Sequence, residues 1–319
     1  MPTQTRNPGK KIAHARLYAA AMILALSCGG SAARPAAAFR KPNLTGKVMV
    51  LEYHHLGGTP LELKKDTQWR RSFASFDHDL AQLEAGGYRP ITLRQLTSGK
   101  FRVPAGTTPV VLTFDDSLLH QVKFTPRGKL DADCVLAHWL AFSRRHPDFP
   151  MRGVFFVNSA YHLAFRQPQF TRQKLELILK LGGEVGNHTW EHTNLGRNHD
   201  PGADIGRGQQ ALQRWLPNYS IVSFALPYGV FPHPNALAWA GSWRDPRGHI
   251  VHWNYRGVVL VGAGPAPSPY TGKFDAHRLP RIQVFDHQLS RWLRYFDQHP
   301  GRRFISDGKR HPLRFLSAR

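Results

Sequence analysis

The sequence predicts an α/β protein in which parallel strands close into a barrel with helices outside. Apolar runs such as residues 48–53 and 110–114 are typical of buried parallel strands. Between them, residues 73–85 place apolar side chains at helical spacing, and Gly86 follows as a stop signal. Because strands and helices alternate along the whole chain, a parallel barrel is the expected architecture.

The expected elements follow one another in a regular order. We predict strands at residues 48–53, 90–92, 110–114, 153–158, 184–186, 221–225, 258–261 and 304–305. We predict helices at residues 73–85, 93–96, 132–145, 172–181 and 205–215. The stretch 231–281 is rich in Gly, Pro and aromatic residues, which predicts long loops around one strand.

The N-terminus has the pattern of a secretory signal. Basic residues precede an apolar stretch from Leu17 to Cys28, and Ala36 to Ala38 match a cleavage site. That stretch is short for a bilayer span. We expect a signal peptide at residues 1–38, a linker at 39–47, one folded domain at 48–319, and an exported protein. An uncleaved anchor and a lipoprotein modified at Cys28 are the alternatives.

Charge and cysteine content limit the possible partners. The 319 residues carry a formal net charge of +22, which favours contact with an anionic wall polymer or membrane surface. The basic residues are scattered and match no nucleic-acid motif, so we expect no nucleic-acid partner; a solvated basic surface is the plain alternative. Only Cys28 and Cys134 are present, so removal of the signal leaves no disulfide or thiol metal cluster. We expect a monomer with Cys134 buried.

Two segments about seventy residues apart carry the chemistry. The strand at residues 110–114 ends in Asp115 and Asp116, and His188 and His192 have a spacing that lets two imidazoles converge. Two His and one carboxylate leave room on a divalent metal for water and substrate, and the second carboxylate can handle a proton. These are the catalytic groups of a metal-dependent hydrolase. The same ligand types serve ferrous oxygenases, but those are usually β folds.

These segments resemble the motifs of a known family. Residues 110–117, 186–195 and 224–229 resemble the first three motifs of the polysaccharide deacetylases, the NodB-homology or carbohydrate esterase 4 family. Residues 50–55 and 87–93 are similar to the branch that includes poly-N-acetylglucosamine deacetylases. The resemblance implies a distorted (β/α) barrel in the family's common seven-stranded form, and a polysaccharide deacetylase domain over residues 48–319.

The resemblance also implies roles for individual residues. Asp116, His188 and His192 would bind a divalent metal, with zinc as the default and cobalt, nickel or iron as alternatives. Asp115 would be the general base, and the backbone N–H of Tyr228 would stabilise an oxyanion.

This chain departs from the family pattern in three places. Ser117 replaces the usual Gly after the Asp pair, and Ala225 stands where many members carry an Arg that orients the base. Arg281 is our candidate to replace that Arg. The general acid is not identified: the motif that carries it is missing.

Four His residues are candidates for the missing acid: His277 and His287 first, and after them His249 and His252. His54 and His55 follow the first strand, where they can line a cleft or simply pack.

The sequence therefore predicts an exported, metal-dependent enzyme that removes acetyl groups from N-acetylated sugars of a polysaccharide or wall glycan and releases acetate. One alternative is an esterase acting on O-acetyl groups, as on xylan. The other is a non-catalytic protein that binds wall glycans with the same fold.

Overall fold

The computed structural model describes residues 40–58, 69–160, 163–285 and 287–313. These belong to one compact unit, Ala37–Arg319. The predicted signal segment and Cys28 lie outside the described residues. Among the described residues, none of the helices has the length and apolar character needed to cross a membrane.

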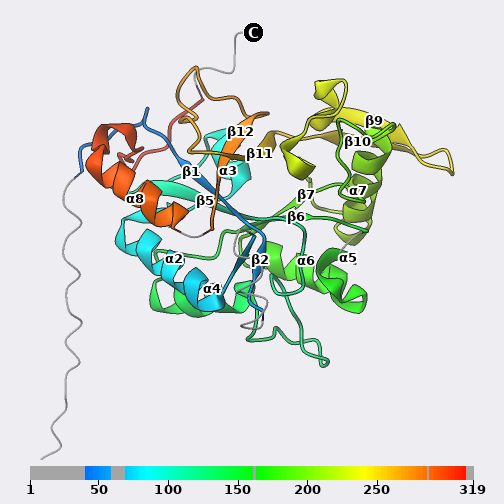
Figure 1. The fold of residues 1–319 in the computed structure, drawn as a ribbon, viewed down its shortest axis with the longest axis horizontal. Coiled ribbons are helices and arrows are strands. Elements are labelled where there is room, and N and C mark those ends of the chain that lie inside the picture. Colours follow the sequence, from blue (N-terminus) through cyan, green and yellow to red (C-terminus); the bar gives the residue numbers. More distant parts are fainter. Residues whose placement is uncertain (1–39, 59–68, 161–162, 286, 314–319) are drawn as a thin grey trace, which may run out of the picture. The chain divides into compact units, whose positions relative to one another are not determined.

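Seven parallel strands form a closed barrel (Figure 1). They are β1 (Met49–Tyr53), β5 (Thr108–Phe114), β6 (Val154–Val157), β7 (Glu184–Asn187), β8 (Ser223–Ala225), β11 (Gly257–Ala263) and β12 (Leu279–Gln283). Each strand pairs with the next in chain order, and β12 and β5 both pair with β1, which closes the ring. An eighth strand, β4 (Tyr88–Pro90), pairs with the first residues of β5. The predicted seven-stranded barrel is confirmed.

Helices cover the outside of the barrel. They are α2 (Phe73–Ala85), α3 (Leu93–Ser98), α4 (Val135–Arg145), α5 (Leu163–Arg166), α6 (Thr171–Lys180), α7 (Pro201–Trp215) and α8 (Gln288–Gln298). The Ser72 hydroxyl caps α2 as an acceptor from the Ser75 N–H. Asp200 caps α7, whose first residue is the N1-favoured Pro201. Cys134 is buried before α4, as predicted.

Side chains alternate along each barrel strand, so that one set packs against the outer helices and the other set fills the inside of the barrel. Outward residues such as Leu112 and Phe114 pack with Phe76 and Trp139 of the helices. The alternate residues, including Val50, Val111, Val154, Ala225 and Val259, form a second cluster inside the barrel. The same parity carries polar groups into the interior near the carboxyl ends: Glu52, Thr113, Asp115 and Arg281 are all buried.

Two predictions about the C-terminal part were wrong, and two elements were missed. Residues 304–305 form no strand; Ile305 makes a single bridge with Asn43. The seventh barrel strand is β12, where Pro280 hid the strand pattern by interrupting the apolar residues. The stretch 231–281 also holds an antiparallel hairpin of β9 (Ala240–Arg244) and β10 (Ile250–Asn254). Helix α8 was missed as well. A short parallel pair, β2 (His55–Leu56) and β3 (Arg70–Arg71), lies beside the barrel.

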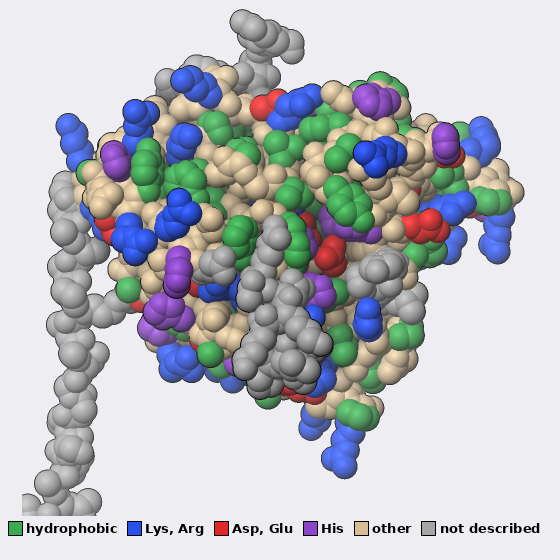
Figure 2. All heavy atoms as spheres, in the orientation of Figure 1, with side chains coloured by type: hydrophobic (Ala, Val, Ile, Leu, Met, Phe, Trp, Pro, Cys, Tyr) green, Lys and Arg blue, Asp and Glu red, His purple; other side chains and the backbone are tan. Residues whose placement is uncertain are grey.

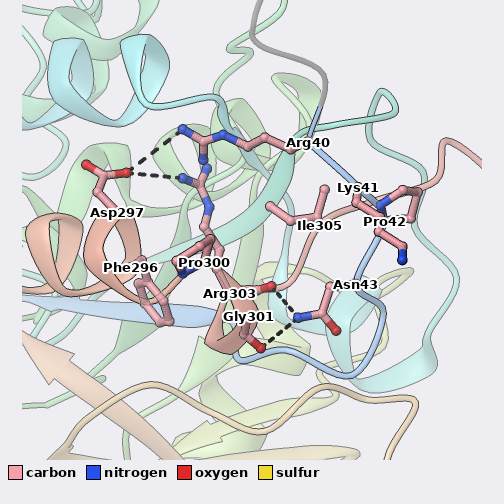
Figure 3. Close-up of a pocket in the computed structure, with 10 residues that line it drawn as sticks. All are labelled: Arg40, Lys41, Pro42, Asn43, Phe296, Asp297, Pro300, Gly301, Arg303 and Ile305. Atoms are coloured by element: carbon pink, nitrogen blue, oxygen red, sulfur yellow. Dashed lines mark hydrogen bonds and ion pairs between the residues drawn. The ribbon is translucent and has the colours of Figure 1, made fainter.

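The two ends of the folded domain are joined around a cavity of about 510 Å³ (Figure 3). The Asn43 amide donates to the carbonyls of Gly301 and Arg303. Arg40 and Arg303 both lie 3.9 Å from the Asp297 carboxylate. Residues of the predicted linker 39–47 thus pair with the C-terminal segment, and this cavity contains none of the predicted site residues.

Candidate active site

The predicted site residues meet at the carboxyl ends of the barrel strands, where barrel enzymes keep their active sites. Asp115 and Asp116 directly follow β5, His188 and His192 follow β7, and Tyr228 lies in a 3₁₀ turn (Pro227–Gly229) after β8. There they border a cavity of about 300 Å³ together with His54, His55, Trp69, Leu226 and Val261. In Figure 2, acidic and His side chains lie together near the middle of the visible face, whereas Lys and Arg are spread around it.

Three donor atoms converge in this cavity. Asp116 Oδ1 lies 3.4 Å from His188 Nε2 and 3.3 Å from His192 Nε2. Ligands of a tetrahedral zinc ion, bound at about 2.0–2.1 Å, stand about 3.3 Å apart. His188 Nδ1 lies 2.8 Å from the Ala225 carbonyl, which holds the proton there and turns Nε2 to the site. The buried Nε2 has no hydrogen-bond partner among the described residues. The donor set fits a divalent metal.

The electrostatics of the two imidazoles also fit a cation. Burial, helped by the neighbouring His188, lowers the pKa of His192 to about 4, so this ring is neutral at pH 7 and can act as a ligand. The pKa of His188 is raised: burial opposes the charged form, but the carboxylates of Asp116 and Asp115 favour positive charge beside them. A divalent ion supplies that positive charge.

The loops that carry these groups are strained. Asp116, Ser117, Thr189, His192 and Tyr228 all have positive φ, between 48° and 70°. Side chains other than glycine adopt this region at a cost, and such residues gather at functional sites. The positive φ of Ser117 gives a physical reason for the Gly that the family pattern usually has there. Its Oγ lies 3.1 Å from the Asn158 carbonyl and accepts from the Asn158 N–H.

Arg281 holds the Asp115 carboxylate in a bidentate pair. Its Nη1 and Nη2 each donate to one Asp115 oxygen at 2.7 Å. Burial favours the neutral acid, but the Arg281 charge and its hydrogen bonds hold the pKa of Asp115 below its ordinary value. Asp115 is therefore ionised, and Arg281 of β12 lies next to it, as expected for a residue that orients this carboxylate.

Glu52 extends this cluster. Its Oε1 lies 3.3 Å from Arg281 Nη2 and 3.7 Å from His54 Nε2, and its Oε2 accepts from the Gly262 N–H at 3.2 Å. Burial raises the pKa of Glu52 although Arg281 acts in the opposite direction. Glu52 was not predicted as a site residue, because a single acidic residue in an apolar strand carries no motif of its own. The signal that could have found it is its position in β1, where alternate side chains point into the barrel.

Comparison with known proteins agrees with this geometry. Residues 102–239 match the polysaccharide deacetylase family model. The matched segment, from the strand before Asp115 to the loop after Tyr228, is thus similar to that family.

Solved structures show the same fold. The Streptococcus pyogenes deacetylase PplD, determined in complex with acetate, superposes with a TM-score of 0.57 at 18% identity, covering 80% of this chain and 98% of that one. A polysaccharide deacetylase from Bacillus cereus gives 0.55 at 13% identity, covering 78% and 68%. No curated protein matched the chain. The NodB-type barrel is thus shared at low identity.

The His residues that were candidates for the general acid lie in different parts of the fold. His277 stacks on Trp239, His249 pairs with Asp245, and His252 is exposed on β10. His287 is exposed at the start of α8. None of these four lines the cavity, whereas His54 and His55 do. The position of His54 directly after β1 was the sequence signal, and packing was an equally good interpretation of it.

Proposed function

We propose that this domain is a metal-dependent N-deacetylase of acetylated glycans. The observation that carries the proposal is the arrangement of Asp116, His188 and His192 around one point, beside an Asp115 carboxylate that Arg281 keeps ionised. A carboxylate next to a metal site is suited to remove a proton from a water nucleophile. Zinc is the metal that this donor set favours.

Each of the chain's own groups has a task in the hydrolysis. Asp116, His188 and His192 would hold the ion, which supplies Lewis acidity and polarises the acetamide carbonyl. Asp115 accepts the proton of the attacking water. The Tyr228 backbone N–H donates to the developing oxyanion. The C–N bond then breaks, and the products are acetate and a free amino sugar.

His54 is our assignment for the missing general acid. It lines the same cavity as His188 and His192, and its Nε2 lies 3.7 Å from the buried carboxylate of Glu52. From this place His54 would deliver a proton to the leaving nitrogen.

The test of the proposal is acetate release from a matched set of substrates. Metal-stripped full chain is assayed with N-acetylglucosamine oligomers, peptidoglycan, poly-N-acetylglucosamine and acetylated xylan, before and after addition of zinc. We expect zinc-dependent release from an N-acetylated glycan. Release from xylan alone would assign an O-acetyl esterase, and no release from any substrate with retained glycan binding would assign a binding protein.

We further propose that the domain acts outside the cytoplasm, delivered by the signal at residues 1–38. The support is the basic, apolar and Ala-rich order of that segment. Expressed with its own N-terminus, the protein should be recovered from the exported fraction beginning near Phe39. Recovery from the cytoplasm with Met1 intact would contradict export; a lipid on Cys28 would keep export and place the protein on a membrane.

A further inference from the structure

Both metal-ligand candidates from β7 lie on one irregular loop, residues 188–193. The loop is not helical, so the His–x–x–x–His spacing alone does not bring the two imidazoles together. Thr189 and His192 have φ of 68° and 56°. Something outside the loop must hold this backbone, because strained conformations persist only where the surroundings determine them.

The Asp204 side chain on α7 provides four contacts to that loop. Oδ1 accepts from the N–H groups of Trp190 at 3.0 Å and Glu191 at 2.7 Å. Oδ2 accepts from the Thr193 hydroxyl at 2.6 Å and the Thr193 N–H at 3.3 Å. The Asp204 carbonyl also accepts from the Trp190 N–H at 3.0 Å. One buried carboxylate therefore serves donors at three of the six loop positions.

These contacts surround the ligands without touching the cavity. Of the three residues that Asp204 contacts, Trp190 and Glu191 lie between His188 and His192, and Thr193 follows His192. On the other side of the loop, Asn187 Oδ1 accepts from the Thr189 N–H, and the Thr189 hydroxyl accepts from the His192 N–H. Asn187 is in turn hydrogen-bonded to the Tyr255 hydroxyl at 2.7 Å. The backbone of the loop is thus held by a neutral network and by the charged side chain of Asp204.

We propose that Asp204 is a positioning residue that sets the separation of His188 and His192 before metal binds, and thereby sets metal affinity. The proposal rests on the metal site of the proposed function. Charge-assisted hydrogen bonds to backbone N–H groups are stronger than neutral ones. A loop already held in the binding geometry pays less ordering cost when the ion enters. Outer groups that orient metal ligands typically contribute about 10–100-fold to metal affinity.

The chain offers a matched control in Asp245, at the tip of the β9–β10 hairpin. It is also a buried Asp that accepts from loop N–H groups, those of Arg247 and His249, and from the Gln210 amide. Asp204→Asn and Asp245→Asn therefore remove comparable charged contacts, one at the His loop and one in a hairpin that contributes nothing to the cavity lining.

The experiment measures zinc affinity of the full chain by chelator competition, and amide hydrogen exchange of residues 188–193 in the metal-free protein. We expect Asp204→Asn to weaken zinc binding about 10–100-fold and to speed exchange of the Trp190, Glu191 and Thr193 amides. Asp245→Asn should leave both unchanged. Wild-type affinity in a folded Asp204→Asn variant would overturn the proposal.

A second variant and a readout that does not depend on catalysis complete the experiment. If Asp204→Asn fails to fold, Thr193→Val is the milder variant: it removes the hydroxyl contact to Asp204 and the one from the Asn198 amide. Unchanged zinc affinity in that variant would count against the proposal. Zinc affinity is read without acetate release. A wild type that binds zinc but releases no acetate would therefore refute the proposed function while leaving the positioning role of Asp204 intact.

Discussion

Two buried arginines at opposite ends of the barrel have different kinds of partner. Arg281, near the carboxyl ends of the strands, binds the Asp115 carboxylate and lies beside Glu52. Arg303 reaches the first residue of β5, where its Nε donates to the Thr108 hydroxyl and its Nη2 to the Gly86 carbonyl. Its guanidinium carbon lies 4.0 Å from the centroid of the Tyr88 ring.

The two surroundings shift the arginine pKa in opposite directions. Burial lowers the pKa of both, but the Asp115 and Glu52 carboxylates raise that of Arg281 above its ordinary value. Arg303, with mainly neutral partners and the distant Asp297, has its pKa lowered to about 10. Arg281 is thus coupled by charge to the candidate base, while Arg303 lies between residues 40–43 and the segment 296–305, as Figure 3 shows. The first should govern chemistry, and the second should govern stability.

The largest expected effect comes from the proposed metal ligands. His188→Ala and His192→Ala should each lose most bound zinc and at least about 10³-fold of acetate release, because two protein ligands hold a divalent ion poorly. His138→Ala, which breaks a His–Asp77 pair outside the cavity, is the control and should keep both. Metal analysis and acetate assays check this; full activity of the metal-free wild type would contradict it.

Arg281→Lys tests the charge coupling itself. Lysine keeps the positive charge but cannot make the bidentate pair. We expect turnover to fall about 100-fold, since loss of orientation has that order of effect, with zinc content retained. Asp115 acts as a carboxylate, and Arg281 holds its pKa below the ordinary value in the wild type. In the variant the pKa of Asp115 should therefore rise, and the acid limb of the pH–rate profile should move to higher pH. An unshifted limb would refute the coupling.

Arg303→Lys is the matched change at the other end. It should lower the free energy of unfolding by about 1–3 kcal/mol, because buried hydrogen bonds and a cation–π contact are lost. Turnover per folded molecule should equal that of the wild type. Denaturant unfolding measures the stability, and acetate assays at denaturant concentrations where the protein stays folded measure the turnover. A loss of turnover in folded Arg303→Lys would contradict the division of roles between Arg281 and Arg303.

The smallest expected effect is at Tyr228, whose side chain is 62% exposed. If its backbone N–H is the group that acts, Tyr228→Ala should change turnover by less than about tenfold, whereas loss of an oxyanion donor costs about 10²–10³-fold. Steady-state kinetics on an N-acetylglucosamine oligomer measure this. A larger loss of turnover with unchanged KM would show that the Tyr228 side chain, and not its backbone N–H, stabilises the oxyanion.

The sequence predicted the barrel and the meeting of the motifs because both depend on local pattern. Apolar strands such as β5 and glycine-terminated helices such as α2 follow from short windows, and polar residues after successive parallel strands must meet at one end. The pairing of Arg281 with Asp115 was only a candidate from the sequence, since it joins residues 166 positions apart. The hairpin β9–β10 was missed because Gly, Pro and aromatic residues obscured its alternation.

Other parts of the site could not be predicted for a different reason. The contacts of Asp204 and Glu52 depend on how α7 and β1 are rotated against their neighbours, which no local pattern specifies. The positive φ of His192 and Tyr228 is imposed by tertiary contacts against local preference.

The central claim is that the adjacent carboxylates divide the work: Asp116 binds metal, and Asp115, held by Arg281, moves the proton. Zinc content and acetate release of Asp115→Asn and Asp116→Asn, measured side by side, test it most directly. We expect Asp115→Asn to keep wild-type zinc and lose at least about 10²-fold of turnover, as for removal of a general base. Asp116→Asn should lose zinc itself. Equal zinc loss in both variants, or full turnover in Asp115→Asn, would contradict this division.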